Sequence, residues 1–165
     1  MSARTDNSLK LEEFLPYRLS VLSNTVSSAI AAAYAERFGL SVPEWRVLAI
    51  LGRYPGLSAG EVAGRAAMDK VAVSRAVTRL LEAGRINRRF ANADRRRSIL
   101  ELSAKGRAVH AKVTPLARYY ERALLEGLSA TERKHFDQLL DKLLRRAYAL
   151  GPATPPSRKA IRSVS

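Results

Sequence analysis

Two short helical segments followed at once by two short β segments restrict the fold of residues 58 to 102 more than any other feature of the sequence. Ser58 and Glu61 have the spacing of a capping box, which predicts a short helix ending near Ala67. Asp69 is placed to cap a second helix, and Gly84 is placed to end it. Two short helices joined by a tight turn predict a helix-turn-helix unit.

After Gly84 the pattern changes to that of strands. Residues 85–90 and 98–102 are short enough to be strands, and a polar turn over residues 91–97 separates them. A basic hairpin after a helix-turn-helix is the winged-helix arrangement, in which the second helix enters the major groove of DNA. The predicted class is therefore mainly α with a small β-hairpin wing.

Long helices are predicted on both sides of this unit. A first helix starts at Pro16 and stops at Phe38 and Gly39. Its apolar residues recur in alternating steps of four and three, like the seam of a coiled coil: Leu15, Leu19, Leu22, Val26, Ala29 and Ala33. A second helix starts at Pro43, carries Trp45, and ends before Pro55.

Two more helices are predicted after the hairpin. Ser103 is placed to cap a long one, and Pro115 inside it is expected to kink or break it. Ser129 and Glu132 repeat the capping-box spacing before a strongly amphipathic last helix. The predicted organisation is a disordered N-terminus (1–10), an N-terminal dimerisation helix (11–42), the winged helix-turn-helix (43–102), C-terminal dimerisation helices (103–150) and a disordered basic tail (151–165).

The charge of the chain points to a polyanionic partner. The 165 residues carry a formal net charge of +14. Residues 68–107 hold 11 Lys and Arg against four acidic residues, so +7 lies in about a quarter of the chain. No run is long and apolar enough to span a membrane, and the charged N-terminus is unlike a signal peptide. With no cysteine, the chain is expected in the cytoplasm, with double-stranded DNA as partner and no membrane.

Candidate DNA-binding residues follow from this placement. The face of the predicted recognition helix opposite Val73 and Val77 mixes base-edge donors, hydroxyls and a methyl-bearing side chain. A plain solvated helix face is the alternative, but the neighbouring basic hairpin favours DNA contact. The predicted DNA-binding residues are Ser58, Lys70, Val71, Ser74, Arg75, Thr78, Arg79, Arg88, Asp94, Arg95, Arg96 and Arg97.

Several of these residues also form motifs that resemble those of the MarR family of bacterial transcriptional regulators. The resemblance rests on Leu81-Glu82-Ala83-Gly84, on Arg88, on Asp94-Arg95-Arg96 and on Leu102-Ser103-Ala104-Lys105-Gly106. Serine replaces the family's threonine at position 103, which preserves the helix cap. The resemblance implies a homodimer whose first and last two helices interlock, and an Asp94–Arg96 pair that holds the wing.

The apolar surface of the flanking helices argues independently for a partner chain. Packing of the same helices within one chain remains the alternative.

The resemblance further implies a small-molecule effector bound between the dimer helices and the winged helix. The candidate wall residues are Tyr17, Arg18, Asn24, Trp45, Arg46 and His110. Residues 15–24 and 38–48 are similar to the branch that senses hydroxycinnamoyl-CoA thioesters and related aromatic acids. Each wall residue also has a purely structural interpretation, Trp45 above all because it falls at a helix junction. No cofactor or metal is expected.

The sequence also bears on two other function classes. His110 and His135 are far apart on different predicted helices, and no glycine-rich phosphate loop is present, so an enzyme is not predicted. An architectural protein that binds DNA without sequence preference has the same basicity and could have the same wing. Only a sequence-specific regulator, which is predicted to act as a repressor, would prefer one inverted repeat.

Overall fold

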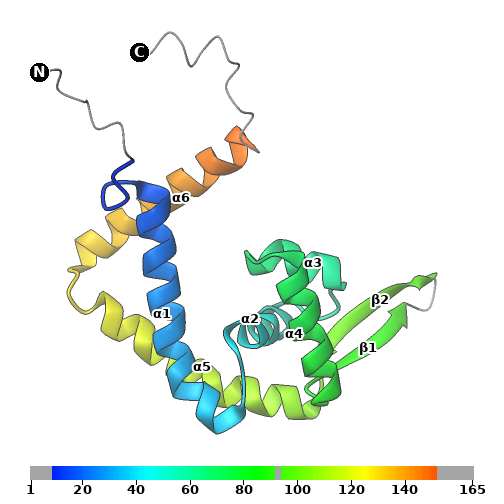
Figure 1. The fold of residues 1–165 in the computed structure, drawn as a ribbon. Helices are drawn as coiled ribbons and strands as arrows, with labels where there is room; N and C mark the ends of the chain where they lie inside the picture. Colours follow the sequence, from blue (N-terminus) through cyan, green and yellow to red (C-terminus); the bar gives the residue numbers. More distant parts are fainter. Residues whose placement is uncertain (1–8, 92–93, 152–165) are drawn as a thin grey trace, which may run out of the picture. The chain divides into compact units, whose positions relative to one another are not determined.

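The computed structural model describes residues 9–91 and 94–151, and it leaves the side chains of residues 91–97 undescribed. The order of elements is α1 (Leu15–Phe38), α2 (Val42–Arg53), α3 (Ala59–Ala66), α4 (Lys70–Glu82), β1 (Ile86–Ala91), β2 (Asp94–Leu102), α5 (Ala104–Leu125) and α6 (Ala130–Leu150) (Figure 1). The predicted class, mainly helical with one antiparallel hairpin, is confirmed. The predicted disorder of the two ends falls almost wholly outside the described residues.

The chain forms two compact units, and the boundary between them along the chain falls within α5, between Tyr120 and Glu121. The first unit contains α1 to α4, the hairpin and the first part of α5. Its core brings together side chains from all of these elements, with Val47, Leu48, Val62, Leu80 and Leu100 completely inaccessible to solvent.

Short-range signals set the helix ends where the sequence predicted them. Ser58 and Ser129 each accept a hydrogen bond from the backbone N–H three residues on and pair with the glutamate there. The Asp69 carboxylate caps α4 by accepting from the N–H of Ala72 at 2.9 Å. Gly39 ends α1 with a φ of 57°, a left-handed conformation that glycine adopts without steric cost. The predicted caps are thus confirmed.

The end of α4 and the start of α5 are locked against each other. Gly84 adopts a positive φ of 64°, and the N–H of Arg85 donates back to the carbonyl of Leu80, which completes a Schellman motif. Ser103 donates its hydroxyl to the Gly84 carbonyl at 2.7 Å and accepts from the N–H of Gly106 at 3.0 Å. One serine therefore caps α5 and ties it to the end of the recognition helix.

The wing differs from its prediction in one respect. β1 and β2 pair antiparallel from Ile86 opposite Leu102 to Phe90 opposite Ser98, and the register then shifts so that Ala91 lies opposite Asp94. Ala91 belongs to β1 and residues 94–97 belong to β2, so the prediction of a turn over residues 91–97 was wrong at these positions. A bulge in the register accommodates the extra residues, and such bulges are not visible in the local sequence pattern. Leu57 also bridges to Leu100 and extends the pairing by one residue.

Pro115 does not break α5, which is continuous from Ala104 to Leu125. Proline has no N–H, so the carbonyl four residues earlier, that of Ala111, loses its helical partner. The hydroxyl of the neighbouring Thr114 donates to the His110 carbonyl at 2.8 Å within the same turn. Of the predicted kink or break, the break is wrong because the helix is continuous, and the kink stays a prediction.

Candidate nucleic-acid interface

The face of α4 that the sequence predicted to read DNA is exposed along its whole length. Val73, Ala76, Val77 and Leu80 are buried, at 1%, 3%, 2% and 0% exposure, and they anchor the helix to the core. The other face is open to solvent and consists of Lys70, Val71, Ser74, Arg75, Thr78 and Arg79. The helix therefore separates an apolar anchor from a surface of cations, hydroxyls and one branched aliphatic side chain.

The wing adds further basic surface. Residues directly opposite in an antiparallel pair point to the same side, so Arg88 shares a face with Leu100, and Arg89 shares the other with Ile99. Arg88 and Arg89 are exposed, and the Arg89 Nε lies 3.6 Å from the carboxylate of Glu101. Asp94, Arg95, Arg96 and Arg97 belong to β2, but their side chains lie outside the described part of the chain.

Ser58 has a local role in addition to the predicted DNA contact. Its hydroxyl donates to the Glu61 carboxylate at 2.7 Å and accepts from the Glu61 N–H at 3.3 Å. Both bonds complete the capping box of α3, the first helix of the helix-turn-helix. A phosphate contact by this hydroxyl would compete with the cap.

An exposed aromatic side chain on the wing was missed by the sequence analysis. Phe90 is 61% exposed, and the strand alternation places it on the same face as Arg88. Its position in a predicted strand suggested nothing unusual, because phenylalanine is common in strands. Only its exposure in the fold distinguishes it from a packing residue.

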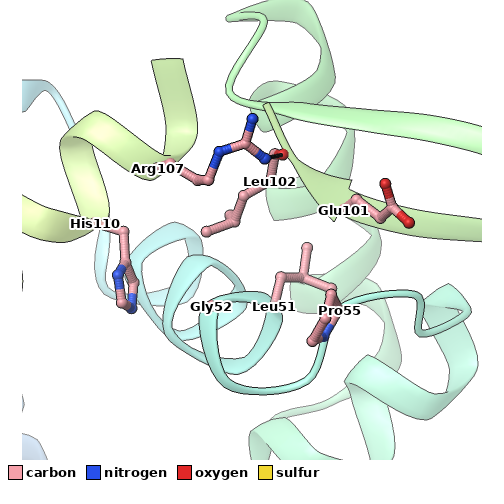
Figure 2. A pocket seen from close by; sticks show the side chains of 7 residues that line it. All are labelled: Leu51, Gly52, Pro55, Glu101, Leu102, Arg107 and His110. Atoms are coloured by element: carbon pink, nitrogen blue, oxygen red, sulfur yellow. Dashed lines mark hydrogen bonds between the residues drawn. The ribbon is translucent and has the colours of Figure 1, made fainter. Parts of the chain in front are cut away.

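A hollow of about 560 Å³ lies where the base of the wing meets α2 and α5. Figure 2 shows Arg107 and His110 coming from α5, Leu51 and Gly52 from α2, and Glu101 and Leu102 from β2. Pro55 completes the lining. Arg107 donates to the Leu102 carbonyl at 2.7 Å, which ties the first turn of α5 to the end of β2.

His110 is held in this hollow by its packing. Its ring stacks on Trp45 with centroids 5.7 Å apart, and Trp45 in turn contacts Tyr34 at 5.8 Å. A Cβ on Gly52 would lie 2.5 Å from the imidazole Nε2, so the glycine leaves room for the ring. Burial lowers the pKa of His110 below its ordinary value of 6.5, which favours a neutral imidazole near pH 7.

Within the single chain, the six predicted effector residues do not all line one hollow. Trp45 and Arg46 line a second hollow of about 100 Å³ with residues of α1 and Val42, and Arg46 donates to the Ser27 hydroxyl at 3.1 Å. His110 lines the larger hollow. Tyr17, Arg18 and Asn24 are exposed on the N-terminal half of α1 and line neither hollow. Arg107 and Glu101 line the larger hollow and were missed, because their approach to α2 depends on the tertiary fold.

The flanking helices expose much apolar surface. On α1, Leu15, Leu19 and Leu22 are 45%, 41% and 46% exposed. None of the residues of α6, all of which the structure describes, is buried, and Leu139 is 59% exposed. Among the helices of the described ranges, none is both long and apolar enough to cross a membrane.

An exposed cationic helix face, carried on a helix-turn-helix and followed by a basic hairpin, defines a winged-helix DNA-binding protein. Comparison with known proteins narrows this class. The sequence profile of the MarR family matches residues 38–97. A transcriptional repressor of Mycobacterium tuberculosis is 30% identical over 131 residues, which cover 79% of this chain and 91% of the repressor. The chain therefore belongs to the MarR family of transcriptional regulators, which are not enzymes.

Solved structures agree with this assignment. A MarR/EmrR family regulator from Acinetobacter sp. ADP1 superposes with a TM-score of 0.76 and 25% identity, covering 84% of this chain and 97% of that one. BpsR of Bordetella bronchiseptica has the same fold, with a TM-score of 0.72 and 22% identity over 82% of this chain and 96% of its own.

Proposed function

We propose that this regulator is a homodimeric, sequence-specific repressor in the cytoplasm that leaves an inverted-repeat operator when a small aromatic acid or its CoA thioester binds. The observation that carries the DNA-binding part is the α4 face, where six exposed residues lie opposite a fully anchored apolar side. A recognition helix needs this division, because its register in the major groove must be held rigidly while its side chains stay free.

Within this proposal the basic residues have two roles. Arg75 and Arg79 lie on the exposed face of α4, where a guanidinium can contact the O6 and N7 of guanine. Arg88 and the arginines at 95 and 97 contact phosphates or the minor groove, which positions the protein without reading sequence. Arg96 pairs with Asp94 to hold the wing, as the family resemblance implies.

The proposed dimer is supported by the exposed apolar residues of α1 and, separately, of α6. Side chains such as Leu19 and Leu139, at 41% and 59% exposure, gain free energy when a partner chain covers them. A two-fold axis also explains why an operator of this regulator would be an inverted repeat. The domain organisation predicted from the sequence, with dimerisation helices on both sides of the winged helix, is part of the proposal.

The hollow beside His110 is the proposed effector site. Its volume of about 560 Å³ lies in the usual range for small-molecule sites, whereas the 100 Å³ hollow beside Trp45 is below it. The Arg107 guanidinium suits a carboxylate, and the neutral His110 ring and Leu51 suit an aromatic ring. Glu101 can accept a hydrogen bond from a ring hydroxyl.

Regulation of a protein of this fold by an aromatic acid has a parallel. In BpsR, 6-hydroxynicotinic acid regulates DNA binding. At 22% identity, the similarity to BpsR supports only a shared fold. The ligand class proposed for this chain therefore rests on the residues that line the hollow. As the specific effector we propose a hydroxycinnamoyl-CoA thioester, because residues 15–24 and 38–48 resemble the branch of the family that senses such compounds. Its aromatic acyl group would occupy the same position in the hollow as the ring of an aromatic acid.

The DNA-binding proposal is tested by comparing one operator, selected from a random library, with an unrelated duplex. Arg75→Ala should weaken operator binding by about 1 to 3 kcal/mol and weaken binding to the unrelated duplex much less. Arg88→Ala should weaken both and make the dependence on salt shallower. Unchanged preference for the operator in Arg75→Ala would contradict the role of α4. Equal protection of all sequences by the wild type would favour an architectural protein.

The effector proposal is tested with a panel of aromatic acids and their CoA thioesters, scored by thermal shift and by release of the operator. A true effector should raise the melting temperature and weaken operator affinity by roughly 5- to 150-fold. Arg107→Gln should abolish the response to the acids. In the absence of ligand, this variant should bind the operator with wild-type affinity. A compound that binds tightly and leaves DNA affinity unchanged would argue against its being the effector.

A further inference from the structure

Val71 is an apolar side chain among the cationic and polar side chains of the exposed face of α4, near the start of the helix. It is 59% exposed, and the residues around it on that face, Lys70, Ser74 and Arg75, are exposed and polar. The core-facing residues of the helix are others, beginning with Val73 at 1% exposure. Packing within the described part of the chain therefore does not account for a branched aliphatic residue at this position.

Helix stability does not account for it either. Valine has a lower helix propensity than alanine, because its branched Cβ restricts χ1 against the preceding turn. At an exposed position in the first turn of α4, which begins at Lys70, this cost is not offset by burial. Alanine would serve the free protein at least as well.

We propose that Val71 contacts the 5-methyl group of a thymine in each operator half-site and so determines specificity at that base pair. This inference rests on the proposed function, in which the exposed face of α4 enters the major groove. Among the base edges presented in that groove, the thymine methyl is the apolar one, and aliphatic side chains are its usual partners. The first residues of a recognition helix are the ones that reach base edges.

The helix geometry also gives an approximate place for the thymine. Val71 and Arg75 are four residues apart on one face, which separates them by about 6 Å along the helix axis. The rise of B-DNA is about 3.4 Å per base pair. The thymine is therefore expected in the same half-site as the guanine that Arg75 contacts, within a few base pairs of it.

The experiment replaces thymine by deoxyuridine, which removes only the 5-methyl group, at each thymine of the selected operator in turn. One position in each half-site should weaken wild-type binding by about fourfold, the value of one buried methyl-sized group. Val71→Ala changes both protomers of the dimer, so it should weaken binding to the unmodified operator by about the square of that factor, roughly sixteenfold, and be indifferent to deoxyuridine at that position. Its melting temperature should equal or exceed that of the wild type.

Two further variants control the interpretation. Val71→Thr keeps one methyl and should retain part of the sensitivity to deoxyuridine. Arg75→Ala removes a neighbouring contact and should leave the sensitivity unchanged. If no deoxyuridine weakens wild-type binding, or if Val71→Ala responds as the wild type does, the inference is overturned while the regulator function stands. A wild type that selects no sequence from the library overturns both.

Discussion

Gly106 shows how one residue type can be required by a backbone contact. A Cβ at this position would lie 1.9 Å from the carbonyl oxygen of Arg85, at the point where α5 approaches the start of the hairpin. The same carbonyl accepts from the N–H of Ser103 at 3.0 Å, so it cannot move away without loss of that bond. The glycine of the Leu-Ser-Ala-Lys-Gly motif thus has a steric explanation.

Gly106→Ala is therefore expected to destabilise the protein although alanine favours helices. We expect a loss of about 1 to 3 kcal/mol in the free energy of unfolding, measured by chemical denaturation, because the backbone must shift to admit the methyl group. Gly64→Ala in α3 is the matched control, since a Cβ there meets nothing within 4 Å, and it should be neutral or stabilising by up to about 1 kcal/mol. Equal effects of the two substitutions would contradict the steric explanation.

His110 should make stability depend on pH in a defined window. Burial lowers its pKa in the folded protein, so the unfolded chain takes up the proton more readily as the pH falls below 6.5. The contribution of the neutral ring to stability is complete above pH 6.5 and is lost progressively below it. Arg107 and Glu101 line the same hollow as His110.

Thermal melts between pH 7.5 and 5 would measure this effect. His110→Gln should flatten the decline relative to the wild type, whereas His135→Gln, which changes an exposed histidine of α6, should not. If the melting temperatures of the wild type and of both variants respond to pH identically, His110 does not titrate differently on folding.

At the scale of elements, the parts that depend on local chemistry were predictable. Gly39, Ser58 and Asp69 act on backbone groups within a few residues, so their roles are visible in the sequence itself. The start of β2 at Asp94 was not predictable in this way, because strand pairing and its bulge depend on the partner strand.

The candidate site likewise has one part that the local sequence predicts and one part that depends on the tertiary fold. The exposed face of α4 was predictable because helical periodicity alone separates it from Val73 and Val77. The hollow beside His110 was not, since it requires Gly52 of α2 and Arg107 of α5 to be brought together by the hairpin between them. No spacing within either helix indicates that approach.

The capping box of α3 gives a prediction that separates stability from DNA contact. Ser58→Ala should lower the free energy of unfolding by about 1 kcal/mol, because the N–H of Glu61 loses its acceptor. Ser58→Asn keeps a capping acceptor and should restore most of that loss. Denaturation and operator binding would be measured on both variants.

The operator affinity of the Ser58→Asn variant then distinguishes a capping role of Ser58 from a direct DNA contact. If Ser58→Asn restores stability and affinity together, the serine acts only through the cap. Affinity that stays low in a stable Ser58→Asn protein would support the direct DNA contact predicted from the sequence.

For the molecule as a whole, the exposed apolar side chains of the flanking helices need a partner surface to cover them. The winged helix buries its own core completely, yet α1 leaves Leu15, Leu19 and Leu22 more than two-fifths exposed, and α6 has no buried residue. Contiguous exposure of this kind is unusual for a monomeric protein and common at obligate interfaces. A second copy of the chain is the occupant that we propose, and it would also account for the proposed inverted-repeat operator.

Sedimentation equilibrium at micromolar concentration should therefore give twice the chain mass of 18.2 kDa. Leu19→Glu places a charge in the seam of α1 and should shift the protein toward the monomer, because a buried unpaired carboxylate is costly. The winged helix should remain folded in this variant, since Leu19 is 41% exposed and absent from the core of the first unit. Operator affinity should nevertheless fall steeply, because the two recognition helices are no longer linked. Leu19→Met preserves the apolar surface and should remain a dimer with wild-type affinity. A wild type that sediments at 18.2 kDa, or a Leu19→Glu protein that stays dimeric, would show that α1 does not form the interface.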